Sequence, residues 1–374
     1  MSNSSTHWKT AKPPHSKVKS AIVTKYFVLW SSVMKKQNSK VVYLDLYAGR
    51  GTWVKGEPST AIQVLGAASK DTFLQKNLVA ILNDISKKNC TNMKLALSEK
   101  RYDVAFAHEP RVTTGCVDEI LAEQLQSLNL APTLCFIDPY GFKGVSLKLI
   151  QSVIKDWGCD VILFFHTSGI NRNLLNPTSQ SDLLALYGTD GYARLMNRVR
   201  TDDTRRDKLI LDEFRSAVMS VGVKYFLPLQ FNFRNRPRLV SHHLILLTKH
   251  PLGFRLMRDD VMEKFSVKED SIPCWKYVEG CEDAGDQLNV GSIGPMAVLK
   301  DKLCADFRGR KILVRDLIGS YDMQGELYTP KNIKAALLLL EDENRIEVDK
   351  PRSQRPVRDG RPTLGDTRIV IFLQ

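Results

Sequence analysis

The stretch VVYLDLYAGRGTW, residues 41–53, changes character abruptly at its centre. Its first half is a short run of β-branched and aromatic residues without helical periodicity, which predicts a buried strand of a parallel sheet. Asp45 lies near the carboxyl end of this strand, where open α/β sheets bind ligands. Gly49 and Gly51 then lack side chains at a sharp turn from strand to helix, so a ligand can lie against the backbone there. A tight turn without a ligand is the alternative interpretation.

Three further apolar segments predict strands of the same sheet: NLVAILNDIS (77–86), CFIDPYGF (135–142) and DVILFFHTSG (160–169). The first of them ends with Asp84, and an acid at that place can accept hydrogen bonds from the hydroxyls of a ribose. Asp138 ends the apolar part of the second. Between them, residues 117–128 carry apolar side chains at helical spacing and acids in the first turn. Strands that alternate with helices predict an α/β fold with a doubly wound, Rossmann-like parallel sheet.

The remaining segments give a domain plan. Residues 19–36 place apolar side chains at helical spacing, which predicts an amphipathic helix that packs across the entrance of the sheet. We expect this helix to belong to a basic arm over residues 1–40, followed by the Rossmann-like domain over 41–265. Residues 266–290 lose apolar periodicity and gather Asp, Glu and Gly, which predicts a linker. A second domain then occupies residues 291–374.

The elements expected in the second domain follow the order helix, helix, helix, strand, basic loop, strand, which is the order of a winged helix. The first helix is expected over residues 292–312, and the third has Thr329 as its cap and Pro330 at its first position. In such a domain the third helix reads a DNA groove and the loop forms a wing that touches phosphates. The wing carries Arg352, Arg355, Arg358 and Arg361, which we expect to project into solvent. Binding of a protein instead of nucleic acid stays open.

The charge distribution favours a polyanionic partner. The chain of 374 residues has a formal net charge of +13. Three stretches, 1–40, 234–258 and 350–374, gather most of the excess of Lys and Arg over Asp and Glu. Because phosphate contacts dominate non-specific affinity for nucleic acid, these stretches predict DNA or RNA as a partner. Solubility together with flexible basic tails is the alternative explanation of each stretch.

The composition also excludes several classes of protein. No apolar run approaches the ~20 residues needed to cross a bilayer, and the N-terminal residues lack the apolar segment of a secretory signal. The seven cysteines are scattered, without a CxxC pair or histidines at zinc-ligand spacing, so neither a disulfide framework nor a metal site is expected. We expect a cytoplasmic protein that does not enter a membrane.

The motifs resemble those of a known family. DLYAGRG resembles the first motif of S-adenosylmethionine-dependent methyltransferases, and FIDPYG resembles the fourth motif of those that methylate amino groups. Over roughly residues 8–265 the chain is more specifically similar to the three-Cys-motif partner (TcmP) family. That similarity rests on KxxIVxKYFxxW (19–30), DLYAGRG (45–51), a Gly-x-Pro-Ser turn (56–59), FIDPYG (136–141), Asn171 with Arg172, and LILLTKHPLG (244–253). The resemblance implies a Rossmann-like methyltransferase fold and a partner protein of the three-cysteine radical type.

The same resemblance implies which residues bind the cofactor S-adenosylmethionine. Asp45, Ala48, Gly49 and Gly51 would border its methionine part, and Asp84 would bind its ribose. Such enzymes often have Gly-Asp after the third strand, where this chain has Gly115-Cys116. Cys116 cannot replace a carboxylate as a hydrogen-bond acceptor, although the adjacent backbone amide can contact adenine. Cys116 would therefore form a wall of the cofactor pocket.

Asp138 and Tyr140 are the candidate catalytic residues. At the mouth of a parallel sheet Asp138 can accept a hydrogen bond from a nucleophilic amine, while Tyr140, or alternatively Phe142, stacks on a flipped-out base. In the alternative, Asp138 caps the next helix at a turn fixed by Pro and Gly. His166, His242 and His243 are interpreted as polar site residues or as satisfied core groups, and Asn171 with Arg172 as substrate contacts or loop anchors.

The function predicted is that of a methyltransferase acting on or at nucleic acid, on an amino group. One alternative is a non-catalytic binding partner of nucleic acid or protein with a vestigial cofactor pocket. The other is a methyltransferase of a protein or small molecule that a partner enzyme delivers.

Overall fold

The computed structural model describes residues 11–99, 106–201, 206–233, 236–279, 294–358 and 361–373, without the side chains of 233–239, 241 and 361. The chain divides into two compact units, one of Met1–Phe265 with Tyr277–Gly280 and one of Ser266–Lys276 with Cys281–Gln374. Ser266–Lys276 was expected to belong to a linker, but it contains a short hairpin of β8 (Lys268–Glu269) and β9 (Ile272–Pro273) in the second unit. Residues 280–290 of that expected linker lie outside the described residues.

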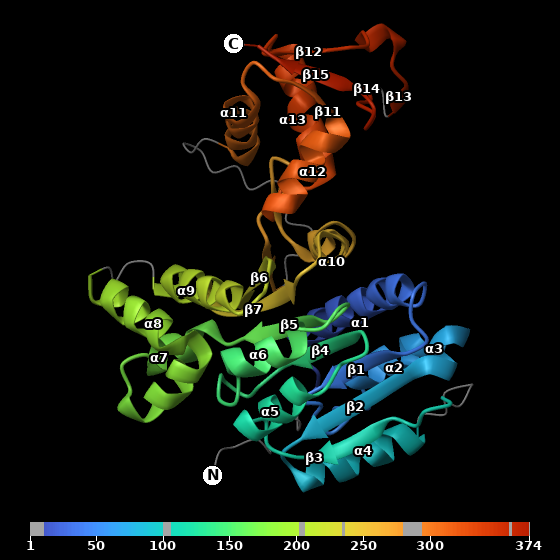
Figure 1. Cartoon of the computed structure of the whole chain (residues 1–374), viewed down its shortest axis with the longest axis vertical. Helices are drawn as coiled ribbons and strands as arrows, with labels where there is room; N and C mark the ends of the chain where they lie inside the picture. The colour runs from blue at the N-terminus through green and yellow to red at the C-terminus, as the bar shows by residue number, and fades with distance from the viewer. Residues whose placement is uncertain are drawn as a thin grey trace. The chain divides into compact units, whose positions relative to one another are not determined.

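The first unit is built around an eight-stranded sheet with the order β10-β6-β7-β5-β4-β1-β2-β3 (Figure 1). Its strands are β1 (Val41–Asp45), β2 (Leu78–Asp84), β3 (Arg111–Thr114), β4 (Thr133–Ile137), β5 (Asp160–Phe165), β6 (Tyr225–Phe233), β7 (Arg236–Thr248) and β10 (Lys276–Val278). Strands β1 to β5 are parallel, whereas β7 runs antiparallel to β5 and to β6. The large parallel sheet expected from the sequence is therefore confirmed, with its order reversing between β1 and β4.

Helices cover both faces of this sheet. They are α1 (Pro14–Met34), α2 (Thr60–Ala68), α3 (Thr72–Asn77), α4 (Lys87–Glu99), α5 (Glu119–Ser127), α6 (Leu147–Ile154), α7 (Thr167–Asn173), α8 (Gln180–Thr201), α9 (Arg206–Ser220) and α10 (Pro251–Arg255). Side chains of α5, α6, α8 and α9 form one core with Leu44 of β1 and Leu163 of β5. On the opposite face α1 packs beside α2, and its Phe27 meets Tyr43 of β1 with ring centroids 5.7 Å apart.

The amphipathic helix expected near the N-terminus is confirmed as α1. Its residues Ile22, Val23, Tyr26, Phe27 and Trp30 are buried, as the helical spacing of the sequence requires. The Tyr26 hydroxyl donates to Asp160 Oδ2 at 2.6 Å, and Asp160 is the first residue of β5. Because a helix rises 1.5 Å per residue, Lys19 lies about 10 Å from Tyr26 along α1, toward the carboxyl edge of the sheet.

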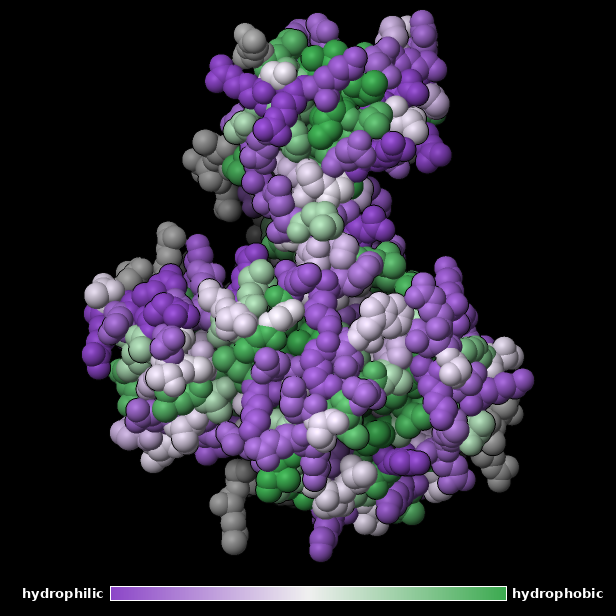
Figure 2. Space-filling view, in the orientation of Figure 1, coloured by the Kyte–Doolittle hydropathy of each residue, from purple (hydrophilic) through white to green (hydrophobic). Residues whose placement is uncertain are grey.

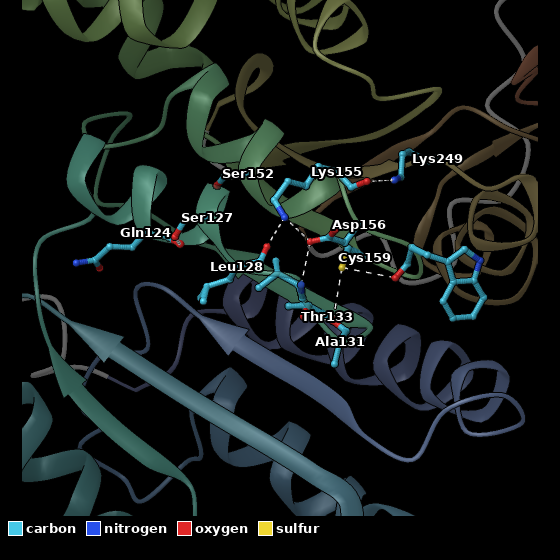
Figure 3. Close-up of polar contacts among 12 residues, drawn as sticks. Gln124, Ser127, Leu128, Ala131, Thr133, Ser152, Lys155, Asp156, Cys159 and Lys249 are labelled. Carbon is cyan, nitrogen blue, oxygen red and sulfur yellow. Dashed lines mark hydrogen bonds and ion pairs between the residues drawn. The ribbon is translucent and has the colours of Figure 1, made fainter.

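Polar contacts hold the opposite, amino edge of the sheet together (Figure 3). Lys155 Nζ donates to Asp156 Oδ2 at 2.5 Å and to the carbonyl oxygen of Leu128. Asp156 Oδ2 also accepts from the Leu130 amide at 2.9 Å, and Lys249 Nζ donates to the Lys155 carbonyl at 2.7 Å. These contacts fix the loops that enter β4 and β5, so this edge stabilises the fold and leaves the carboxyl edge for ligands.

The second unit has its own core of apolar side chains. Its main elements are α11 (Pro295–Phe307), β11 (Lys311–Leu313), α12 (Val314–Gln324), α13 (Pro330–Asp342), β12 (Ile346–Val348), β13 (Val357–Arg358), β14 (Arg361–Pro362) and β15 (Ile369–Phe372). Strands β11, β15 and β12 form an antiparallel sheet in that order, and β13 pairs with β14.

Two expectations for this unit meet different outcomes. The start of α13 is confirmed, because Thr329 Oγ1 accepts from the Asn332 amide in a capping box and Pro330 occupies the first turn. The single helix expected over 292–312 is wrong at its end. Gly309 adopts φ 67°, a left-handed conformation that ends the helix and lets the chain enter β11.

Hydrophilic residues cover much of the face drawn in Figure 2, and hydrophobic residues lie between them in patches. Within the part of the chain that the structure describes, no helix combines the length and the apolar composition needed to cross a membrane.

Candidate functional site

The candidate site lies at the carboxyl edge of the sheet, where the strand order reverses between β1 and β4. Side chains alternate between the two faces along each strand. Cys135 and Ile137 of β4 lie in the core under α5 and α6, and so do Leu163 and Phe165 of β5. The alternate side chains of these strands therefore face α1. Asp138 follows Ile137 directly and continues this pattern on the side of α1.

Asp45 is the buried acid of this edge. Its side chain is 2% exposed and accepts hydrogen bonds from the Tyr43 hydroxyl and the Tyr47 amide, both at 3.2 Å. Burial, followed by the negative charge of Asp138, raises the pKa of Asp45 to about 7, against the lowering effect of Lys19. Two carboxyl groups of different character thus lie close together, one buried and one partly exposed.

Asp138 forms an ion pair with a lysine of α1. Lys19 Nζ lies 2.5 Å from Asp138 Oδ2, and the two side chains are 10% and 23% exposed. The same ammonium lies 4.2 Å from the centre of the Phe164 ring, at the distance of a cation–π contact. The alternative role of Asp138 as a helix cap is wrong, because Ser146 caps α6.

This ion pair was not predicted from the sequence, although a signal for it is present there. Lys19 precedes Ile22 and Val23 by three and four residues, so it lies on the buried stripe of α1 rather than on its solvated face. A lysine on a buried stripe requires a partner, and the nearest candidates are the acids at the strand ends.

Two of the three histidines considered from the sequence join the same face. The His242 ring stacks on Phe164 with centroids 4.5 Å apart, and it meets His166 edge-on at 4.1 Å. Burial, followed by the charges of His166 and Lys19, lowers the pKa of His242 to about 2, so its imidazole is neutral at pH 7. His243 lies apart from them and hydrogen-bonds to Thr167 Oγ1 at 2.7 Å.

Asp84 organises the loop that follows β1. Its carboxylate accepts from the Gly49 amide at 3.1 Å, the Ser86 amide at 2.8 Å and Asn89 Nδ2 at 3.1 Å. A carboxylate offers about four acceptor positions, so three donors leave about one for a further hydroxyl group. The site therefore has the acceptor that a ribose requires.

The fold itself explains why glycine occupies two positions of this loop. Gly49 and Gly51 adopt φ 68° and 89°, conformations that favour glycine. A Cβ on Gly51 would lie 2.7 Å from Ala96 Cβ of α4, so this glycine makes room for helix packing. Ala48 is buried and its amide donates to the Asn83 carbonyl at 2.8 Å.

The remaining candidates are more exposed. Cys116 is exposed just beyond β3, while the neighbouring Gly115 carbonyl accepts from Asn83 Nδ2 at 3.0 Å. Tyr140 is 74% exposed in the loop after β4, where its ring is accessible for stacking. Asn171 donates to Asp207 Oδ1 at 3.2 Å, which favours its interpretation as a loop anchor.

The wing arginines differ from one another. Arg355 is 5% exposed, and its Nη2 lies 2.6 and 2.7 Å from the two carboxylate oxygens of Glu341 on α13. Arg352 pairs with Glu341 at 2.9 Å and with Asp342. The expectation that these two guanidinium groups project into solvent is wrong, because the acids at the end of α13 attract them. Arg358 is exposed, and the side chain of Arg361 lies outside the described residues.

Among the residues that the structure describes, no three His, Cys, Asp or Glu side chains gather as a metal site would require. The sheet order defines a Rossmann-like α/β unit, and the acids at its carboxyl edge make the topological switch point the candidate ligand site.

Comparisons with known proteins give distant matches to solved structures. No family model and no curated protein matches the chain. Matching solved structures include WbdD with a kinase inhibitor (13% identity, TM-score 0.36), the DszA carbon methyltransferase (16%, 0.39) and the magnesium protoporphyrin IX methyltransferase ChlM from Synechocystis PCC 6803 with bound SAM (12%, 0.29). The matches cover 62%, 63% and 66% of this chain and 40%, 55% and 92% of those chains. This chain thus spans less than two thirds of the length of WbdD and DszA.

We expect opposite shifts of the Asp45 pKa in two variants. Asp138→Asn removes a negative charge that raises this pKa, so the pKa should fall below about 7. Lys19→Met removes a positive charge that lowers it, so the pKa should rise. Carbon-detected NMR titration of the Asp45 carboxyl measures both, with the exposed Lys36→Met as control. Shifts of the same sign in both variants would contradict the proximity of the three groups.

The raised pKa of Asp45 also predicts a pH dependence of stability. The pKa is above its ordinary value of about 3.9, so the folded state binds the proton more tightly than the unfolded state. The corresponding stabilisation is complete below pH 4 and is lost as the pH rises through about 7. Asp45→Asn, which cannot ionise, should flatten this part of the pH profile of the unfolding free energy.

Replacing Arg355 and replacing Arg358 should have different effects on the unfolding free energy. Arg355→Ala leaves Glu341 partly buried without its closest partner, so the unfolding free energy should fall by about 3 kcal/mol. Arg358→Ala, an exposed change in the same hairpin, should stay within about 0.5 kcal/mol. Urea unfolding measures both. Equal losses in the two variants would show that the buried ion pair does not stabilise this unit.

Proposed function

We propose that this chain is an S-adenosylmethionine-dependent methyltransferase that acts on an amino group of nucleic acid. The observation that carries the proposal is the placement of Asp45, Asp84 and Asp138 at the carboxyl edge of β1, β2 and β4, around the switch point. The glycine loop after β1 lies between the first two of these acids in the chain and is tied to Asp84. The motifs DLYAGRG and FIDPYG, which contain two of the acids, support the same reaction class.

The residues present fit the cofactor. The free acceptor position of Asp84 suits a ribose hydroxyl, and the loop from Asp45 to Gly51 would hold the methionine part. Cys116 follows β3 next to Gly115, where the backbone can border the adenine. S-adenosylmethionine would supply a methyl group made electrophilic by the adjoining sulfonium.

The protein would act mainly by positioning its substrate. Asp138 accepts a hydrogen bond from the substrate amine and so orients the nitrogen lone pair, and the proton lost on methylation passes to solvent. Holding the two reactants in line contributes most of the acceleration in such a transfer. The exposed ring of Tyr140 offers a stacking surface to a base that has left its helix.

We assign the second unit as a winged helix. Its helices α11 to α13, its sheet order β11-β15-β12 and the hairpin β13–β14 support this assignment. In a winged helix α13 would enter a groove, and the exposed Arg358 would contact a phosphate from the wing. Because Arg352 and Arg355 are already paired with acids, the phosphate contacts proposed for the wing fall to Arg358 and Arg361. The proposal includes a cytoplasmic location and a partner protein of the three-cysteine radical type.

One observation favours a second candidate function. The ion pair with Lys19 already occupies one oxygen of Asp138, as it would in a protein whose site no longer performs catalysis. The chain would then be a binding partner of nucleic acid or protein with a vestigial cofactor pocket.

Binding of the cofactor separates these functions in part. S-adenosylhomocysteine should bind the wild-type chain, and Asp84→Ala should weaken binding by about 1.5 to 3 kcal/mol, the effect of losing a hydrogen bond to a charged group. Isothermal titration calorimetry measures the affinity, and the exposed Glu119→Ala serves as control. The absence of heat with the wild type at saturating ligand would reject the cofactor site.

Methyl transfer tests the chemistry. With a labelled methyl donor and a mixture of DNA and RNA, the wild type should label nucleic acid. Asp138→Asn should bind S-adenosylhomocysteine normally and transfer methyl groups on the order of 100-fold more slowly, because the amine is no longer oriented. A wild type that binds the cofactor and labels nothing supports the vestigial site, whereas label on protein alone rejects nucleic acid as substrate.

A further inference from the structure

Lys19 is held in place far more firmly than a surface lysine. It projects from α1, which the Tyr26–Asp160 hydrogen bond and five buried side chains fix to the sheet. Its ammonium lies between Asp138 Oδ2 and the ring of Phe164, and its side chain is 10% exposed. The fold therefore places an ammonium group beside the carboxylate that is proposed to receive the substrate amine.

Acidic and basic groups both surround this ammonium. Asp45 lies close enough for Lys19 to lower its pKa, which is about 7, and Glu57 pairs with Lys17 at 2.7 Å. The His242 imidazole is neutral at pH 7. Lys12, buried two residues before α1, donates from Nζ to Ser20 Oγ and to the Pro58 carbonyl, both at 2.8 Å. Burial, followed by the charge of Lys19, lowers the pKa of Lys12 to about 8, while the charges of Glu57 and Asp138 raise it.

The pairing of Lys19 with Asp138 discriminates between classes of amine. A protonated amine, such as a lysine side chain or a polyamine, would be a second cation on a carboxylate whose charge Lys19 already compensates, and like charges repel. An uncharged amino group on a nucleobase suffers no such repulsion. A phosphate beside that base is attracted to the ammonium of Lys19.

We propose that Lys19 determines the substrate class of the site, excluding cationic amines and moving from Asp138 to a phosphate of the nucleic acid when substrate binds. The inference rests on the proposed function, because it specifies the charge of the substrate amine that receives the methyl group in that reaction. The ammonium of Lys19 then pairs with the phosphate. Asp138 becomes free to accept a hydrogen bond from an uncharged amino group. A substrate must then carry an anion and a neutral amine together.

The salt dependence of nucleic-acid binding tests this transfer. The probe is a labelled single-stranded oligonucleotide of mixed sequence, titrated with the full chain at several salt concentrations. Lys19→Met should reduce the slope of log affinity against log salt by roughly 0.7, the value of one phosphate contact on a single strand. Lys19→Arg should keep the wild-type slope. Lys36→Met removes an exposed charge just beyond α1 and should not change it by that amount.

The variant Asp138→Asn provides an independent test, because it should change the affinity for the oligonucleotide in the opposite direction. Without the carboxylate Lys19 is released to the phosphate, so the oligonucleotide should bind about two- to fivefold more tightly, the strength of a partly exposed ion pair. A pair that served the fold alone would lower the melting temperature in both variants and leave both the slope and the affinity unchanged. That result, or a wild type that does not bind the oligonucleotide, would overturn the inference.

Binding of S-adenosylhomocysteine, measured on the same samples, keeps the two proposals apart. Unchanged cofactor binding with an unchanged salt slope in Lys19→Met rejects the role of Lys19 alone. Loss of cofactor binding in the wild type rejects the methyltransferase, whatever the slope.

Discussion

The candidate site depends on the packing of α1 against the sheet. Tyr26 is tied to the first residue of β5 at the amino edge, and the length of the helix then brings Lys19 to the carboxyl edge. Burial of an apolar stripe gives this placement its free energy, since a fully buried large apolar side chain contributes roughly 1.5–3 kcal/mol. The polar contacts at the two ends fix where along the sheet the helix comes to rest.

Alternation along the strands then decides which side chains meet. Side chains on one face of the sheet join the core under α5 and α6, and those on the other face point toward α1. The acids at the ends of β1 and β4, the ring of Phe164 and two imidazoles share that second face because each follows the two-residue period of its strand. Shifting the register of β5 by one residue would turn Phe164 toward the core under α5 and α6, and every other side chain of the strand would change face with it.

Local patterns in the sequence were sufficient to predict the parallel strands, the acids at their ends, the apolar stripe of α1 and the cap of α13. These features depend on residues that are neighbours along the chain. The partner of Lys19 could not be predicted in the same way, because Asp138 is 119 residues away and several acids end strands. The hairpin of β6 and β7 was also missed as a unit of the sheet. The burial of Arg355 was not predicted because a basic loop is usually solvated. Only the position of Glu341 explains this burial.

The distance along the chain between α1 and its partners has a consequence for synthesis. During translation α1 leaves the ribosome long before β5, since Tyr26 and Asp160 are 134 residues apart. At 5–20 residues per second, roughly 7 to 27 seconds pass in which the apolar stripe has no sheet to cover. A nascent helix with an exposed stripe is a binding site for chaperones, and the lysines that flank it help to keep the unfinished chain soluble. The helix that completes the site is therefore also an exposed apolar surface of the newborn protein until the sheet has been made.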